Sequence, residues 1–201
     1  MRNHSTTTST TVTSDLVATE LSAAADLLRA AAPLPPMMVM YAPRQSWRLM
    51  LAPEEAVAAS RQQVAVKRLA ARMSADVVRR SGSPPWAHAA WGGVGVFVSA
   101  QPTSADHVGH GATAEQADLV ETLAPWVYEM TQAGAEEIWV HQPHDQGVNP
   151  DHRLRVSVHA TSEVAEHLVT LDDSFGQRPG TGAWAGSALT PTGHDVVIVR
   201  T

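Results

Sequence analysis

The sequence predicts an α+β fold built from two pseudo-repeated units, each a helix, a hairpin, a second helix and a second hairpin. Together the two units are expected to form one mostly antiparallel sheet with the helices on one face. Segments with helical and with strand periodicity occur in the same order in both halves of the chain. The 44% share of hydrophobic residues, without any cysteine, is typical of a globular domain that has no disulfides.

The first unit is expected over residues 14–100, after a Ser/Thr-rich tail at residues 1–13 that is too polar to fold and is predicted to be disordered. Its expected elements are a helix from Ser14 to the prolines at 33–36, strands at 37–41 and 47–51, a long helix from Pro53 to Arg80, and a hairpin over 86–99 bent at Gly92 and Gly93. A polar linker at residues 101–112 follows it.

The second unit is expected over residues 113–201, and both units should form one compact domain. Its helix should begin with a capping box of Thr113 and Gln116, bend at Pro125 and end at Gly134. The further elements expected are strands at 137–141 and 153–159, a helix over 161–171, and extended segments around Trp184 and at 195–200.

Local sequence similarity favours an internal repeat. The segment from Met38 to Arg44 aligns with Ile138 to His144, and each has three apolar residues, a ring, a proline and a basic residue. The residues around Trp91 resemble those around Trp184. Pairing the two units edge to edge would cover one open sheet edge of each. Chance similarity among hydrophobic strands is the alternative interpretation.

Charge is unevenly distributed along the chain, whose net charge is −6. Residues 1–100 hold ten basic and six acidic residues, whereas residues 101–201 hold four basic and fourteen acidic ones. The halves are therefore expected either to attract each other or to offer one basic binding face.

Four arginines are predicted to form a straight row on the long helix, because their spacing returns them to within roughly 20° of one direction. They are Arg61, Arg68, Arg72 and Arg79. Such a row fits an acidic protein groove or a phosphate backbone, and the alternative is a solvated face. Trp86 and Trp91 are expected to be partly exposed and to serve as anchors for a protein partner.

Histidines and aspartates cluster on one predicted hairpin. His141, His144 and His152, with Asp145, could bind a divalent metal such as Zn²⁺ and activate water for hydrolysis. The alternative is a polar loop with solvated side chains. Apart from this possible metal, no cofactor is expected.

No recognisable catalytic motif is present, and a Gly-x-Ser-x-Gly nucleophile elbow in particular is missing. The favoured function is therefore a non-catalytic macromolecular interaction protein that binds another protein through its polarised surface. A metal-dependent hydrolase and a nucleic-acid-binding protein are the alternatives. With no apolar run long enough to span a bilayer and no secretory signal, a cytoplasmic protein without a membrane partner is expected.

Overall fold

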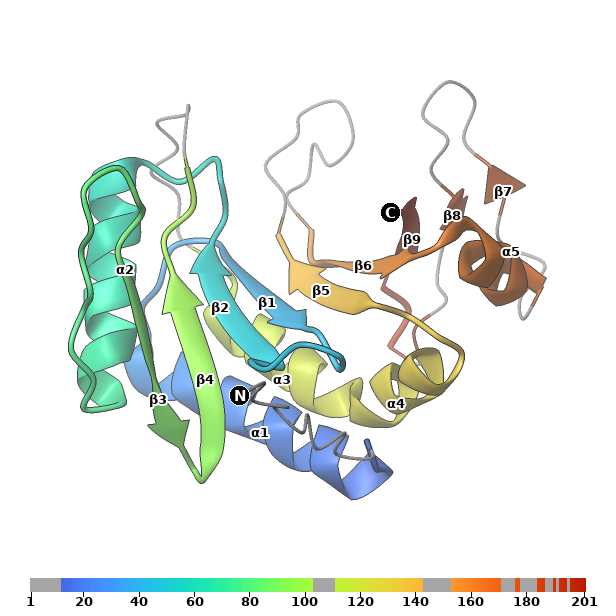
Figure 1. Cartoon of the computed structure of the whole chain (residues 1–201), viewed down its shortest axis with the longest axis horizontal. Coiled ribbons are helices and arrows are strands. Elements are labelled where there is room, and N and C mark those ends of the chain that lie inside the picture. Colours follow the sequence, from blue (N-terminus) through green and yellow to red (C-terminus); the bar gives the residue numbers. More distant parts are fainter. Residues whose placement is uncertain are drawn as a thin grey trace, which may run out of the picture.

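The computed structural model describes residues 12–102, 111–142, 153–170, 176–177, 184–186, 190, 192–194 and 196–201. These residues form five helices and nine strands, so the predicted α+β class is confirmed (Figure 1). The elements are α1 (Ser14–Ala31), β1 (Met37–Tyr41), β2 (Leu49–Pro53), α2 (Ala59–Arg72), β3 (Trp86–Trp91), β4 (Val94–Ser99), α3 (Thr113–Thr122), α4 (Ala124–Gln132), β5 (Glu137–His141), β6 (Arg155–Ala160), α5 (Ser162–Thr170), β7 (Gly176–Gln177), β8 (Trp184–Gly186) and β9 (Val196–Arg200).

All described strands belong to one mixed sheet in the order β3-β4-β2-β1-β5-β6-β9-β8-β7. Six neighbouring pairs are antiparallel, and two pairs, β2 with β4 and β6 with β9, are parallel. The antiparallel pair of β1 and β5 lies at the centre and joins the first part of the chain to the second. Each parallel pair is connected through a helix, as parallel strands require a crossover.

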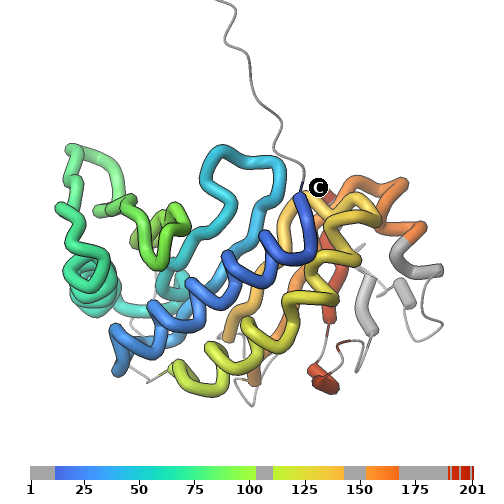
Figure 2. Tube along the Cα trace, turned by 90° about the horizontal axis from the view of Figure 1, so that it is seen from below, coloured from blue at the N-terminus to red at the C-terminus, as the bar shows by residue number. Residues whose placement is uncertain are grey.

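The helices share one face of the sheet and bury a single large core. Residues of all five helices belong to this core, together with alternate residues of the strands, such as Ile138 and Val140 of β5. α1 lies alongside α3 and α4 beneath the sheet, while α2 and α5 lie towards its two ends (Figures 1 and 2). Because side chains alternate along a strand, residues such as Trp139 point to the opposite face.

That opposite face carries a second, smaller apolar cluster. Met38, Met40, Met50 and Ala52 of β1 and β2 form its buried centre. The rings of Trp47, Phe97 and Trp139 pack around it and remain partly exposed. This face, which no helix of the described residues covers, also carries the polar side chains considered below.

α1 follows its sequence prediction closely. It begins at Ser14, and the hydroxyl of Thr13 caps it by accepting a hydrogen bond from the Leu16 N–H at 3.2 Å. One acidic residue of this helix, Glu20, is only 4% exposed. Its carboxylate accepts hydrogen bonds from Tyr41 Oη at 3.0 Å and from Arg48 Nε at 2.7 Å, which ties α1 to the β1–β2 hairpin.

α2 is much shorter than predicted. Pro53, the expected helix start, instead belongs to β2, where it pairs with Met37 of β1. The helix ends at Arg72 because Ser74 adopts a left-handed conformation, with φ of 54°. The N–H of Ser74 then bonds to the carbonyl of Ala71, and the N–H of Ala75 to that of Ala70, a pattern that terminates helices. The expectation of helix up to Arg80 is therefore wrong.

The helix predicted from residue 113 is present as two helices, with a break at Leu123 where the bend at Pro125 was expected. Pro125 lies in the first turn of α4, where its missing N–H costs no helical bond. The predicted capping box is wrong, because the side chain of Gln116 is buried and donates to the carbonyls of Met37 and Val140 at 2.8 and 2.9 Å. Gly134 ends α4 with φ of 107°, as predicted.

The remaining strands lie close to their predicted positions, and Gly92 and Gly93 form the tight turn between β3 and β4 with positive φ. Most of the predicted tail, residues 1–11, and most of the predicted linker, residues 103–110, lie outside the described residues. None of the helices in the described part of the chain combines the length and hydrophobicity of a transmembrane span.

Candidate functional site

The predicted arginine row is interrupted by the end of α2. Arg61, Arg68 and Arg72 lie on the helix, whereas Arg79 lies seven residues beyond its last residue. The left-handed turn at Ser74 redirects the chain, so the prediction of a straight row up to Arg79 is wrong. Two of the helical arginines, Arg61 and Arg68, face a pocket.

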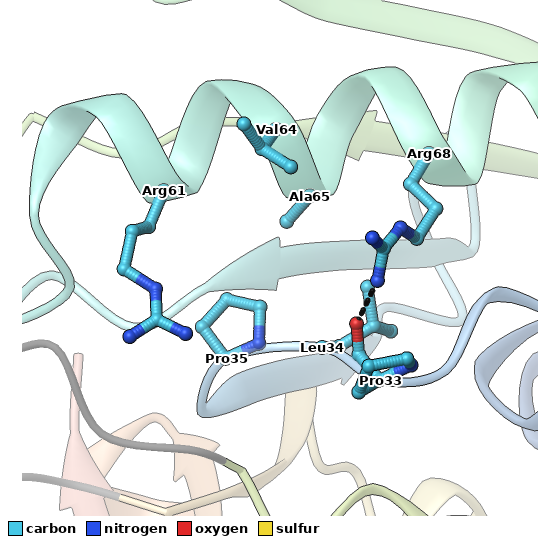
Figure 3. A pocket seen from close by; sticks show the side chains of 7 residues that line it. All are labelled: Pro33, Leu34, Pro35, Arg61, Val64, Ala65 and Arg68. Atoms are coloured by element: carbon cyan, nitrogen blue, oxygen red, sulfur yellow. Dashed lines mark hydrogen bonds between the residues drawn. The ribbon is translucent and has the colours of Figure 1, made fainter.

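This pocket lies between α2 and the segment that connects α1 to β1, and has a volume of about 290 Å³. The residues lining it are Pro33, Leu34, Pro35, Arg61, Val64, Ala65 and Arg68. The two arginine side chains reach down from α2 at opposite ends, with Val64 and Ala65 between them on the helix (Figure 3). The site therefore combines an apolar centre with a guanidinium group on each side.

One feature of the pocket sets it apart from the rest of the described surface. Val64 is 55% exposed, and it is the one exposed large hydrophobic residue in the part of the chain that the structure describes. Arg61, Val64 and Arg68 follow one another at i, i+3 and i+7, so they share one side of α2. Arg72 is exposed on the same helix but does not line the pocket.

Two contacts fix the wall of the pocket opposite α2. Arg68 Nη1 donates a hydrogen bond to the carbonyl oxygen of Pro33. Gly111 donates its N–H to the carbonyl of Leu34 at 3.2 Å. A Cβ at position 111 would lie 2.4 Å from the carbonyl oxygen of Pro35, so only glycine allows this approach.

The two tryptophans predicted to anchor a partner do not line this pocket. Both are partly buried. Trp86 stacks on Phe97 with ring centroids 5.5 Å apart, on the face away from the helices. Trp91 lies five residues along β3, on the other face, and packs against the main core.

Of the residues predicted to bind a metal, His141 alone lies within the described residues; His144, Asp145 and His152 lie outside them. His141 is the last residue of β5, and its ring lies between the side chains of Ser157 and Glu54. Its Nε2 atom lies 2.8 Å from Ser157 Oγ of β6, and its Nδ1 atom lies 3.7 Å from Glu54 Oε1 just after β2. Within the described ranges no three histidine or acidic side chains are grouped to hold a metal ion.

Burial strongly changes the acid–base properties of this group. Removal from water raises the pKa of Glu54 to about 7, assisted by the nearby charge of Glu55 and opposed by the hydrogen bond from the Gln142 N–H. Removal from water also lowers the pKa of His141 to about 4, and the positive charges of His159 and Arg155 lower it further. At neutral pH His141 is therefore an uncharged imidazole.

Sequence reasoning missed this arrangement of acid, imidazole and hydroxyl. Glu54, His141 and Ser157 come from three separate segments, so no motif of fixed spacing links them. The one available signal is that every second residue of β6 is polar: Arg155, Ser157 and His159 lie on the face of the strand that points away from the main core.

Comparisons of the chain with protein-family models, curated proteins and solved structures find no significant match. Its function must therefore be argued from the two sites themselves, the pocket beside α2 and the group around His141.

Proposed function

We propose that the protein is a non-catalytic interaction protein and that the pocket beside α2 binds an acidic, partly apolar segment of a partner protein. The observation that carries the proposal is the exposed Val64 between the guanidinium groups of Arg61 and Arg68. An exposed apolar residue at a concave site with flanking arginines is typical of interfaces, where apolar anchors are surrounded by polar groups.

The spacing of these residues favours an extended partner segment. Arg61 and Arg68 are separated by seven residues, or about 10 Å along a helix axis. In an extended chain, residues i, i+2 and i+4 face one way and span about 13 Å, which long arginine side chains can match. A segment with the pattern Glu-x-Leu-x-Glu would therefore present a carboxylate to each arginine and its leucine to Val64.

Guanidinium groups recognise phosphates as well as carboxylates, so a nucleic acid is the competing ligand. The shortened helix limits the arginine row to Arg61, Arg68 and Arg72, and the net charge of −6 disfavours a polyanion. The apolar centre of the pocket also favours a peptide, since a phosphate backbone offers no apolar group at that position.

The test is fluorescence anisotropy with the full chain and a labelled ten-residue peptide that contains Glu-Ser-Leu-Ser-Glu. Arg61→Glu and Arg68→Glu should each weaken binding at least tenfold, since an attraction becomes a repulsion. Arg72→Glu is the matched control and should weaken binding several-fold less than Arg68→Glu, because its charge lies one helical turn beyond the pocket. Circular dichroism of each variant verifies that it is folded.

Three results would contradict the proposal. The first is an equal loss in Arg72→Glu and Arg68→Glu, which would indicate a general charge effect. The second is equally tight binding of a peptide with lysines in place of the glutamates. The third is tighter binding of a single-stranded oligonucleotide of the same length, which would favour a nucleic-acid-binding function.

We further propose that residues 14–100 and 113–201 are copies of one unit. The support is topological: outwards from the central pair, the strand order is β1-β2-β4-β3 on one side and β5-β6-β9-β8-β7 on the other, so the second side matches the first and adds one short strand, β7. On each side the second strand is parallel to the last strand of its unit. Superposition of β1, β2, β3 and β4 on β5, β6, β8 and β9 tests this, and poor agreement of the strand positions or of the preceding helices in a crystal structure of the whole chain would refute it.

A further inference from the structure

We propose that Ser157 is a nucleophile towards small acyl and phosphoryl electrophiles, with His141 as its general base and Glu54 as the group that orients His141. This inference concerns a site on the helix-free face of the sheet and is independent of the pocket beside α2. It therefore assigns the protein a chemical reactivity in addition to partner binding.

The pairing of the strands brings the three groups together. Ser157 of β6 lies directly opposite Trp139 of β5, and His141 follows two residues along on the same face. Diagonal neighbours of this kind are within reach of each other's side chains, and here the Ser157 Oγ to His141 Nε2 distance is 2.8 Å. Glu54 reaches the ring from the other side, after β2.

The order of the atoms is that of a nucleophile activated by a base. The hydroxyl bonds to one ring nitrogen of His141, and the carboxyl group of Glu54 lies nearest to the other ring nitrogen. The N–H of Gln142 holds Glu54 Oε1 at 2.9 Å and fixes the carboxyl group beside the ring. The Nδ1 to Oε1 distance of 3.7 Å is longer than a hydrogen bond, as is common in sites without substrate.

The flanking residues of β6 provide a second observation. Arg155 and His159 lie two residues on either side of Ser157, on the same face of the strand. The Nε2 atom of His159 is buried and has no hydrogen-bond partner among the described residues. The ring of His159 stacks on that of Trp139, the residue opposite Ser157, with the ring centroids 4.2 Å apart, so His159 and Trp139 form one wall beside the serine. The charge of Arg155 is close enough to affect His141 and would favour a developing oxyanion.

Proton positions determine whether Ser157 is activated. When Glu54 is ionised it favours the proton on Nδ1 of His141, which leaves Nε2 free to accept the hydroxyl proton of Ser157. When Glu54 is protonated it can donate to Nδ1, and Nε2 then carries the proton and donates to Ser157 instead. Only the first arrangement makes His141 a base towards the serine.

The reaction of a phosphoryl fluoride, such as diisopropyl fluorophosphate, at this site can be written in full. Ser157 Oγ forms a bond to phosphorus while its proton passes to His141 Nε2, the phosphorus–fluorine bond breaks, and fluoride leaves. The proton then passes to water. With p-nitrophenyl acetate the same attack releases p-nitrophenolate and leaves one acetyl group on Ser157, a single modification rather than a catalytic cycle. Ser157 is only 7% exposed, which restricts the reaction to small electrophiles.

The test is labelling of the full chain with diisopropyl fluorophosphate, followed by intact-mass measurement and peptide mapping. One adduct per chain is expected, on Ser157, and Ser157→Ala should abolish it. Ser99→Ala is the matched control, because Ser99 is a more exposed strand serine whose hydroxyl bonds only to the Ala100 carbonyl in the described contacts. That variant should label at the wild-type rate.

Two further variants test the assigned roles. His141→Gln should slow labelling at least 100-fold, and Glu54→Gln at least tenfold, while both remain folded by circular dichroism. No adduct on the wild-type protein, or an adduct that persists in Ser157→Ala, would overturn the proposal. An unchanged rate in folded His141→Gln would also overturn it, because the serine would then react without its base.

The pH profile provides an independent readout. Labelling of the wild-type protein should rise with pH with a midpoint at about 7, as Glu54 ionises, and Glu54→Gln should lose this rise. In the part of the chain that the structure describes, the charged and titratable groups facing the site are Glu55 beside Glu54, Arg155 and His159 beside His141, and Glu137 next to His159. A profile that Glu54→Gln leaves unchanged would overturn the role of Glu54.

Discussion

Replacing Arg48 by methionine tests the buried ion pair between α1 and the β1–β2 hairpin. The side chain of Glu20 is 5% exposed, and Arg48 is 26% exposed. The Arg48 Nη2 atom lies 2.5 Å from Glu20 Oε1, and Nε donates to the same oxygen at 2.7 Å. Methionine retains the aliphatic part of the arginine side chain, so the substitution mainly removes charge and two short contacts.

The expected loss of unfolding free energy is large, because among the described residues the substitution leaves the buried carboxylate with the Tyr41 hydroxyl as its remaining partner. Breaking a buried pair by removing one partner costs about 3–5 kcal/mol. Partial exposure of Arg48 places the expected loss at about 2–4 kcal/mol. For a chain of this size, each kcal/mol corresponds to about 2–4 °C in the unfolding midpoint. Adding Glu20→Gln should restore at least about 1 kcal/mol, since the unpaired charge is removed.

The assay is urea unfolding at pH 7.5, followed by tryptophan fluorescence. Arg29→Met is the matched control, because Arg29 also forms ion pairs but on the surface, with Asp118 at 2.7 Å, Glu121 at 2.8 Å and Asp26 at 3.4 Å. Exposed pairs of this kind contribute about 1 kcal/mol or less, so Arg29→Met should have a small effect. The reasoning is refuted if Arg48→Met loses less than about 1 kcal/mol, or if both variants lose equally.

Two further predictions concern stability. Ser74→Gly should raise the unfolding free energy by about 1 kcal/mol, because glycine adopts the positive φ of 54° without strain. Ala71→Gly, in the last turn of α2, should lower the unfolding free energy by a similar amount. Thermal unfolding measures both variants, and midpoint shifts of the same sign would contradict the prediction. Burial raises the pKa of Glu54 above its unfolded value, so the folded protein retains a proton that the unfolded chain releases, and stability falls as pH rises from about 4.5 to about 7. Glu54→Gln should remove up to about 3 kcal/mol of this fall, and equal pH dependence in urea titrations of both proteins would contradict it.

The sequence predicts best those elements whose boundaries depend on local chemistry. The Gly92–Gly93 turn, the Gly134 helix end and the start of α1 are all where the local residues indicate them. The end of α2 was missed because a serine, rather than a glycine, occupies the left-handed position after the helix. The start of α2 was missed because strand pairing with β1 outweighs the suitability of Pro53 for the first turn of a helix.

Long-range polar contacts account for the remaining differences. Gln116 has the spacing of a capping residue, but in the fold its side-chain amide donates hydrogen bonds to one carbonyl of β1 and one of β5. The group of Glu54, His141 and Ser157 depends on the register of three distant segments, which no local pattern encodes. The sequence singled out Arg61 and Arg68 as part of an arginine row but did not predict the pocket, because its other wall comes from the distant segment at residues 33–35.

The outer strand β3 affects how readily two molecules associate through their sheet edges at high protein concentration. It forms one end of the sheet, and its sequence, WAHAAW, contains no lysine, acidic residue or proline to discourage pairing with another chain. Its first residue is already engaged, because Val78 bonds to both the N–H and the carbonyl of Trp86 at 3.1 and 2.7 Å. The chain segment that leaves α2 thus blocks the start of this edge, and strand exchange between two molecules would have to begin at the Trp91 end or displace Val78 first.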